Sequence, residues 1–317
     1  SRLDCIKPGN LTDDFDEMKD ADWIIEAVVE RIDIKHQLYA KIDQVRSSSS
    51  IVSSNTSTIP LSVLTSEMPE SMKSDFCITH FFNPVRFMRL LEIVKTPEFD
   101  ETKMDGLLDF CQKELGKGIV ICNDTPGFIG NRIGVYAMQV AMYEALERGL
   151  PVEIADALFG RPLGIPKTGV FGLYDLIGID LMKDVLASFK KELQPEDPFM
   201  DVVKPHPVVE ALLDKGYTGN KGPGGFYETK IVDGEEIVKA LNVSDMSYYD
   251  FDKVDLPLAR RVEKEGMKAL LNDDSDYGRY AFAVFAKIIN YSAFCHSYRR
   301  STLSPQQSLQ RGRVFGR

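Results

Sequence analysis

The sequence predicts an α/β fold followed by a mostly helical part. Up to about residue 122, short apolar runs alternate with amphipathic stretches, as is typical of a parallel sheet flanked by helices. The pattern changes at residues 123–127, where Asn-Asp-Thr-Pro-Gly precedes one long apolar helical stretch. A second change comes near residue 233, after a glycine cluster. We therefore expect three parts, at residues 1–123, 124–232 and 233–317.

The expected elements follow from periodicity and from turn residues. Ile34, Leu38 and Ile42 recur at helical spacing after the first apolar run. Asp233-Gly234 is a typical hairpin turn between two runs of strand-forming residues. These patterns predict strands at 23–29, 51–53, 76–82, 90–94 and 118–122, a hairpin over 227–238, and helices at 104–115, 128–148, 256–271 and 280–294.

Composition limits the classes of function. Of the 317 residues, 44% are hydrophobic and 27% are charged, as in soluble globular proteins. The net charge of −10 argues against a nucleic-acid or membrane-surface protein, because such proteins bind polyanions through basic patches. No run approaches the roughly 18 apolar residues of a membrane span. A cytoplasmic protein is expected.

The five cysteines are odd in number, widely spaced and mostly flanked by apolar residues. None shows the paired spacing of a zinc site, so free buried thiols and no metal site are expected. Residues 277–317 contain seven Lys or Arg and no Asp or Glu. The last 17 residues are polar and Arg-rich, and we interpret this end as disordered or truncated rather than as a nucleic-acid-binding tail.

His80 is the histidine best placed for chemistry. It closes an apolar run just before Pro84, which cannot continue a central strand. Ligands of open α/β sheets collect beyond the carboxyl ends of strands. His80 is therefore a candidate base at a strand end.

Glu92 lies inside the next apolar run, where a carboxylate is costly without a partner. If the two strands pair about a turn centred on Arg86, His80 and Glu92 face each other across the sheet. A carboxylate on one ring nitrogen fixes the tautomer and makes the other a better base. A structural ion pair explains the spacing equally well, and spacing alone does not separate the two.

The hydroxyl-rich run at residues 53–58 follows a short strand. Its residues can bind a ligand at a strand end, but taken alone the run is typical of a helix cap.

Together these segments resemble the 3-hydroxyacyl-CoA dehydrogenases, especially the multifunctional bacterial type of fatty-acid β-oxidation. The motifs occur in the order and nearly the spacing of that family, over about residues 10–230. They are Ile-Glu-Ala-Val-Val-Glu at 25–30, Ser-Asn-Thr-Ser at 54–57, His-Phe-Phe-Asn-Pro at 80–84, Leu-Glu at 91–92, Asp-Thr-Pro-Gly-Phe-Ile at 124–129 with Asn-Arg at 131–132, and residues 221–227.

The resemblance implies an incomplete Rossmann-type dinucleotide-binding domain followed by the all-helical C-terminal domain of that family. It makes His80 the general base, Glu92 its orienting partner, and Ser57 and Asn131 substrate-positioning residues. Asn83 matches a family position that contacts both the substrate and the cofactor. The other positions matching contacts to NAD are Val28, Val29, Glu30, Lys35 and again Ser57.

The implied reaction is NAD-dependent oxidation of a 3-hydroxyacyl-CoA to the 3-ketoacyl-CoA. An acyl-CoA is the expected partner, and a homodimer the expected assembly. Two alternatives stay open: a catalytically silent, crystallin-like relative, and a related dehydrogenase acting on free hydroxy acids or on 3-hydroxybutyryl-CoA outside β-oxidation.

The sequence departs from the family in one respect. The family's glycine-rich G-x-G-x-x-G turn is absent, because Gly116-Lys117-Gly118 and the cluster at 222–225 do not open a helix after a strand. The resemblance implies that residues 1–20 enter partway through the dinucleotide domain, downstream of the pyrophosphate site.

We therefore expect weak or no NAD binding by this chain alone, and an isolated chain that is inactive. Calorimetric titration with NADH measures this directly. Micromolar affinity would contradict it.

Overall fold

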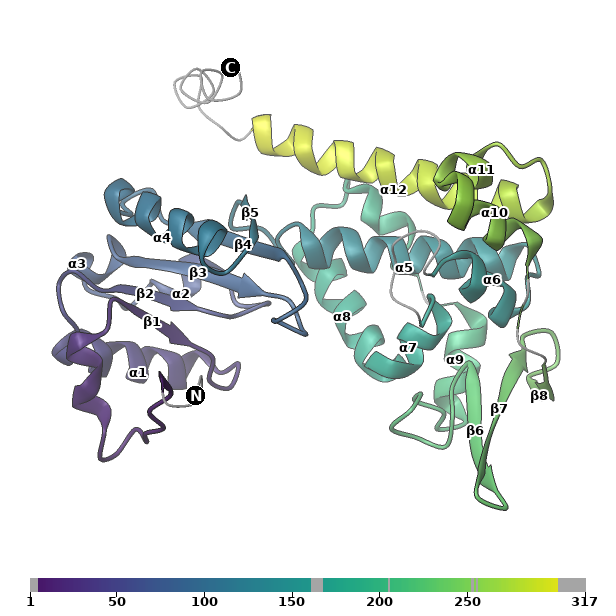
Figure 1. The fold of residues 1–317 in the computed structure, drawn as a ribbon, viewed down its shortest axis with the longest axis horizontal. Coiled ribbons are helices and arrows are strands. Elements are labelled where there is room, and N and C mark those ends of the chain that lie inside the picture. The colour runs from purple at the N-terminus through teal and green to yellow at the C-terminus, as the bar shows by residue number, and fades with distance from the viewer. Residues whose placement is uncertain (1–4, 161–167, 205, 252–253, 255, 302–317) are drawn as a thin grey trace. The chain divides into compact units, whose positions relative to one another are not determined.

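The computed structural model describes residues 5–160, 168–204, 206–251, 254 and 256–301. Within them the chain forms two compact units, which divide between Arg132 and Ile133. The predicted α/β fold with a mainly helical part after it is confirmed (Figure 1). The basic end from residue 302 onward lies outside the described residues, and so does the prediction made for it.

The first unit is built on a sheet with strand order β1-β2-β3-β4-β5. Adjacent strands run parallel except β3 and β4, which are antiparallel. The strands are β1 Trp23–Glu26, β2 Ile51–Ser54, β3 Phe76–Phe81, β4 Leu90–Lys95 and β5 Gly118–Ile121. The helices are α1 Ile32–Val45, α2 Leu61–Leu64, α3 Glu70–Lys73 and α4 Glu101–Lys113, with a 3-10 turn at Phe15–Asp20.

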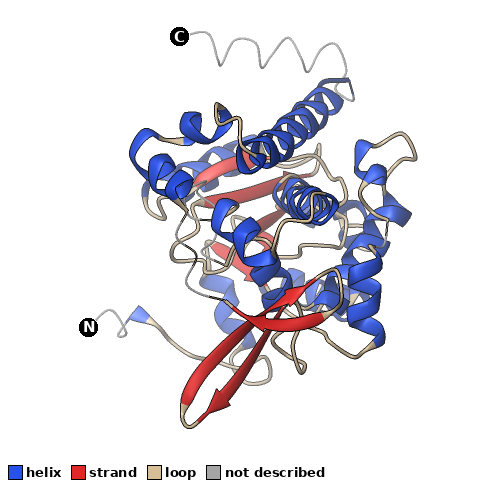
Figure 2. Cartoon of the chain, turned by 90° about the vertical axis from the view of Figure 1, so that its right-hand side faces the viewer, coloured by secondary structure: helices blue, strands red, loops and turns tan. Residues whose placement is uncertain are grey.

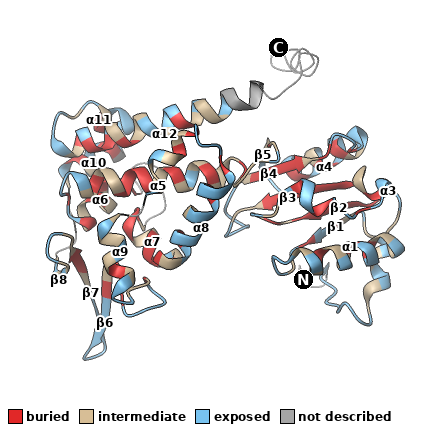
Figure 3. Cartoon of the chain, turned by 180° about the vertical axis from the view of Figure 1, so that it is seen from behind, coloured by how far each residue is buried: buried red, intermediate tan, exposed pale blue. Residues whose placement is uncertain are grey.

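Helices cover both faces of this sheet, with α1 on one face and α4 on the other (Figure 1). Alternate strand residues face opposite ways, so each strand contributes to two cores. Ile78 packs in a core with Tyr39 and Ile42 of α1, whereas its neighbour Cys77 packs in a core with Leu107 of α4. The three central strands, β2, β3 and β4, are accordingly buried on both faces (Figure 3).

Helix α5, Gly130–Glu147, begins in the first unit and continues into the second. The later helices are α6 Val152–Leu158, α7 Phe171–Ile177, α8 Ile179–Glu192, α9 Pro207–Asp214, α10 Pro257–Glu265, α11 Met267–Leu271 and α12 Asp276–Ser301, with a 3-10 turn at Pro198–Asp201. One apolar core joins most of these helices. At its centre Tyr136 of α5 stacks on Tyr291 of α12 with ring centroids 4.0 Å apart.

A small antiparallel sheet completes the second unit, with order β6-β7-β8. Its strands are β6 Tyr227–Val232, β7 Glu235–Asn242 and β8 Ser247–Asp250. Strands β6 and β7 form the predicted hairpin about Asp233-Gly234 and project as a long arm (Figure 2). Strand β8 was not predicted.

Asp175 of α7 anchors the chain that leads into β6. Its buried carboxylate accepts hydrogen bonds from the backbone N–H groups of Phe226 and Tyr227, at 2.9 and 2.7 Å. A Cβ atom at Gly225 would lie 2.0 Å from a carboxylate oxygen of Asp175, so only glycine fits there. Burial raises the pKa of Asp175 to about 6, although the two N–H groups oppose this.

This raised pKa predicts how the second unit responds to pH. Between about pH 4 and 6 the folded state keeps a proton on Asp175 that the unfolded chain has lost, since an unperturbed Asp titrates near 3.9. Stability contributed by this group therefore falls as the pH rises through that window. We expect Asp175→Asn to lower stability at every pH but to flatten the fall between pH 4 and 7, measured by thermal unfolding. Asp214→Asn, at an exposed aspartate on α9, is the control, and an unchanged slope in Asp175→Asn would contradict the assignment.

Most predicted elements are present, with shifted ends. Strand β1 stops at Glu26 instead of Val29, because the Glu26 carboxylate accepts from the Val28 N–H and the chain turns into α1. The single helix predicted at 256–271 is two helices, since Gly266 has a φ of 77°, outside helical geometry. No helix of the described residues is long and apolar enough to cross a membrane.

Candidate active site

Polar side chains of the first unit gather on one face of its sheet. Ile24, Val52 and Ile78 face the core shared with α1. Because side chains alternate, residues two positions further along β1, β2 and β3 share that face. They are Glu26, Ser54 and His80, and all three stand at the carboxyl ends of parallel strands, where ligands of such sheets bind.

His80 and Glu92 form a buried pair. They are direct cross-strand partners in the β3–β4 register, and His80 Nδ1 lies 2.9 Å from Glu92 Oε2. Glu92 is fully buried and His80 is 6% exposed. The imidazole ring packs against the rings of Phe82 and Phe128, at centroid distances of 4.5 and 5.7 Å.

The second oxygen of Glu92 binds the start of helix α5. Glu92 Oε1 accepts from the backbone N–H groups of Ile129 and Gly130, at 2.9 and 2.7 Å, and from the Cys122 thiol at 3.6 Å. A carboxylate is favoured at a helix N-terminus by these free N–H groups and by the helix dipole. An ionised Glu92 can only accept, so the ring nitrogen that faces it carries the proton. His80 Nε2 is then the basic nitrogen.

Gly130 is required at this point. A Cβ atom at position 130 would lie 2.5 Å from the Phe82 ring. The glycine therefore lets the first turn of α5 approach both the Phe82 ring and the Glu92 carboxylate. Asn131 follows on the same turn, half-buried.

Glu26 was not predicted as a site residue, although its carboxylate accepts four hydrogen bonds. Oε1 accepts from Lys35 Nζ and from the Val28 N–H, each at 2.7 Å. Oε2 accepts from the Tyr39 and Ser54 hydroxyls, also at 2.7 Å. The side chains of Glu26 and Lys35 are 0% and 1% exposed, so this is a buried ion pair with its hydrogen bonds satisfied.

Lys35 also contacts Glu30, with Nζ to Oε2 at 3.0 Å. Glu30 Oε1 accepts from the Thr56 hydroxyl at 2.6 Å and from the Ser57 N–H at 3.2 Å. Burial raises the pKa of Glu30, but the hydrogen bonds from Thr56 and Lys35 outweigh it and hold that pKa below its usual value. The structure thus joins Glu30, Lys35 and Ser57, which were predicted together.

The Ser57 segment is also tied to the His80 strand. Asn55 Oδ1 accepts from the Phe81 N–H at 3.0 Å, which holds the end of β2 beside the end of β3. The half-buried Ser57 side chain has no hydrogen-bond partner among the described residues. Its hydroxyl is therefore available to a ligand.

Two other predicted residues, Val29 and Asn83, lie on the exposed surface of the first unit. Val29 is 60% exposed, and Asn83 is exposed in the turn after β3. The Asn83 amide has no hydrogen bond to the described part of the chain, and the structure leaves both side chains open to solvent. The described part of the chain has no group of three or more His, Cys, Asp or Glu side chains that could hold a metal ion.

Two models of one protein family match this chain. Residues 2–125 match the 3-hydroxyacyl-CoA dehydrogenase NAD binding domain, and residues 127–229 match the 3-hydroxyacyl-CoA dehydrogenase C-terminal domain. A probable 3-hydroxyacyl-CoA dehydrogenase of Caenorhabditis elegans is 38% identical over 73% of this chain and 71% of its own length. The chain belongs to the 3-hydroxyacyl-CoA dehydrogenase family.

Two further relatives extend the comparison. A putative fatty acid oxidation complex trifunctional enzyme of Rickettsia prowazekii is 37% identical over 92% of this chain, but the chain spans only 39% of its length. The solved structure of 3-hydroxybutyryl-CoA dehydrogenase from Escherichia coli shows 30% identity and a TM-score of 0.56, and it covers 68% of this chain and 44% of its own. The predicted family is confirmed.

Proposed function

We propose that this chain carries the proton-transfer site of an NAD-dependent 3-hydroxyacyl-CoA dehydrogenase of fatty-acid β-oxidation. The observation that carries the proposal is the buried His80–Glu92 pair, in which one ring nitrogen is bonded to a carboxylate and the other has no hydrogen bond to the described residues. A structural ion pair would need no hydroxyl groups around it. Here the open Ser57 hydroxyl stands on a segment bonded to the strand of His80.

In the proposed reaction His80 Nε2 takes the proton of the substrate's 3-hydroxyl group as the ketone forms. Glu92 keeps the ring oriented and stabilises the imidazolium that results. General-base help of this kind contributes about 10²- to 10⁴-fold in rate. Ser57 and Asn131 would hold the substrate oxygen near the base.

The residues fit the nicotinamide side of an NAD site. The loop from Glu26 to Lys35 is held rigidly by buried hydrogen bonds, while Val29 and the Asn83 turn stay exposed to a ligand. Val28, Val29, Glu30, Lys35, Ser57 and Asn83 would hold the cofactor there. When bound, NAD⁺ supplies the hydride acceptor for C3.

The test is a substrate series in the intact protein. NADH should be oxidised with acetoacetyl-CoA and also with longer 3-ketoacyl-CoA thioesters. Turnover of the four-carbon thioester alone would favour a 3-hydroxybutyryl-CoA dehydrogenase, the activity named for the Escherichia coli neighbour. Equal turnover of free 3-ketoacids would contradict the acyl-CoA assignment, and no turnover at all would favour a silent, crystallin-like relative.

Glu92→Gln tests the role of the carboxylate. The oxygen of the introduced amide can still accept from the N–H groups of α5, but its NH₂ group then faces His80 Nδ1 and favours the wrong tautomer. We expect kcat to fall about 10- to 100-fold while KM changes little, with an altered pH profile of kcat. Glu101→Gln, at an exposed glutamate of α4, is the control, and a normal pH profile in Glu92→Gln would speak for a merely structural pair.

We further propose a homodimeric assembly, as the family resemblance implies. Sedimentation analysis of the intact protein would test it, and a monomer at micromolar concentration would contradict it.

A further inference from the structure

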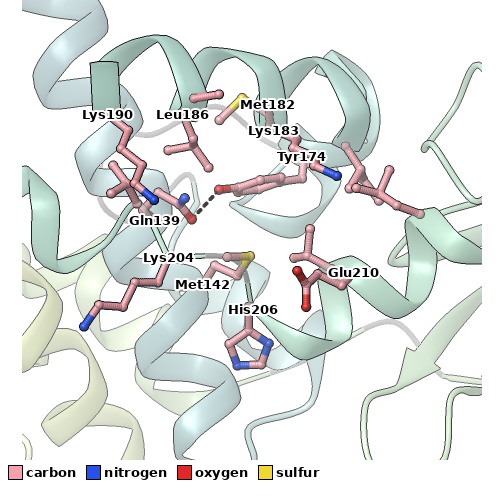
Figure 4. Close-up of a pocket in the computed structure, with 15 residues that line it drawn as sticks. Gln139, Met142, Tyr174, Met182, Lys183, Leu186, Lys190, Lys204, His206 and Glu210 are labelled. Atoms are coloured by element: carbon pink, nitrogen blue, oxygen red, sulfur yellow. Dashed lines mark hydrogen bonds between the residues drawn. The ribbon is translucent and has the colours of Figure 1, made fainter. Parts of the chain in front are cut away.

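The second unit contains a pocket that the proposed reaction does not use. It lies among α5, α7, α8 and α9 and has a volume of about 190 Å³ (Figure 4). Apolar side chains form most of its wall, among them Met142, Met182, Leu186, Val209 and Leu213. Every lining residue belongs to the second unit, so the pocket can be considered by itself.

One buried polar group faces this apolar wall. Gln139 is 1% exposed, and its amide oxygen accepts a hydrogen bond from the Tyr174 hydroxyl at 2.8 Å (Figure 4). Its amide nitrogen makes no hydrogen bond to the described residues. The Gln139 NH₂ group is therefore a donor that a ligand in the pocket could satisfy.

The rim of the pocket is positively charged. Lys183, Lys190 and Lys204 line it and are exposed, and within the described ranges none of them forms an ion pair. Glu210 is the one acidic residue in the lining. Three ammonium groups and an amide donor around an apolar wall are complementary to an amphiphilic anion.

The volume limits how much of that ligand the pocket can enclose. One water molecule takes about 30 Å³ of liquid, so a pocket of about 190 Å³ has room for roughly six non-hydrogen atoms. We propose that this pocket binds an unbranched aliphatic carboxylate of about six to eight carbons. The pocket encloses roughly six non-hydrogen atoms of the chain against its apolar wall, and the remaining atoms, with the carboxylate, lie at the rim toward the exposed lysines and the Gln139 NH₂ group. The inference goes beyond the proposed dehydrogenase activity and does not depend on it.

Calorimetric titration of the chain with octanoate tests the proposal. Saturable binding of one octanoate per chain is expected, with octyltrimethylammonium and octanol at least tenfold weaker because they lack the anionic head. The double variant Lys190→Gln/Lys204→Gln should bind octanoate at least fivefold more weakly. Lys191→Gln/Lys215→Gln, at exposed lysines outside the pocket, should bind it normally.

Several results would overturn the proposal: no saturable binding of octanoate, equal binding of the octyl cation, or the same loss in both lysine variants. Tighter binding of octanoyl-CoA than of octanoate would do so too, because it would assign the lysines to the phosphates of a thioester. Octanoate binding that appears only when copies of the chain dissociate would assign the pocket to a second copy. Octanoate binding by a protein with no dehydrogenase activity would support this inference while the proposed function fails.

Discussion

Replacing His80 by Gln in the intact protein should lower kcat for acetoacetyl-CoA reduction by about 10²- to 10⁴-fold, the range that general acid–base catalysis supplies. Gln fills a similar space and can still bond to Glu92, but it cannot carry a proton to or from the substrate oxygen. KM should change little, because His80 Nε2 acts on the proton that moves during the reaction rather than on the body of the substrate. The measurement is the steady-state loss of NADH absorbance at saturating substrate.

His36→Gln is the matched control for this variant. His36 lies on α1, where its ring contacts the Val63 carbonyl and the Glu67 carboxylate, outside the His80–Glu92 pair. It should retain wild-type kcat. Trp23 is the one tryptophan of the chain and lies in β1, so its fluorescence reports whether the first unit is folded in each variant. A folded His80→Gln protein with undiminished kcat would place the catalytic base elsewhere.

The His80–Glu92 pair shows how far local pattern can reach. Pro84 ended one apolar run and Glu92 interrupted the next, and pairing about a turn centred on Arg86 would make His80 and Glu92 partners. The β3–β4 register contains that pair. The register alone did not predict the bonds from Glu92 to Ile129 and Gly130. Those groups are 37 and 38 residues away along the chain, and only the folded unit brings them to the carboxylate.

Glu26 shows where the same reasoning was not carried through. Like Glu92, it is a carboxylate inside an apolar run, and that pattern indicates a buried partner. The strand was expected to continue to Val29, which hid the fact that Glu26 is the last residue of β1. Its partners Lys35 and Tyr39 come from the facing side of α1, one helical turn apart, as i and i+4 residues do.

Glu26→Ala should destabilise the first unit by about 3–5 kcal/mol, the cost of leaving one member of a buried ion pair without its partner. The loss leaves the ammonium of Lys35 with Glu30 alone, and it also removes the acceptor of Tyr39 and Ser54. Urea unfolding followed by Trp23 fluorescence measures this free energy, because Trp23 lies on the same strand. Glu70→Ala, which breaks an ion pair whose glutamate is 80% exposed, should cost no more than about 1 kcal/mol.

A double variant separates the burial of a charge from the loss of contacts. Glu26→Leu/Lys35→Met removes both charges and keeps apolar volume in their place, so it should destabilise less than Glu26→Ala, since no buried charge is left unpaired. It should nevertheless weaken cofactor binding in the intact protein, because Lys35 no longer holds Glu30 beside Thr56. If Glu26→Ala unfolds at the wild-type urea concentration, the pair contributes nothing to stability. If the double variant instead loses more stability than Glu26→Ala, the hydrogen bonds to Tyr39, Ser54 and the Val28 N–H, rather than charge pairing, hold the loop after β1.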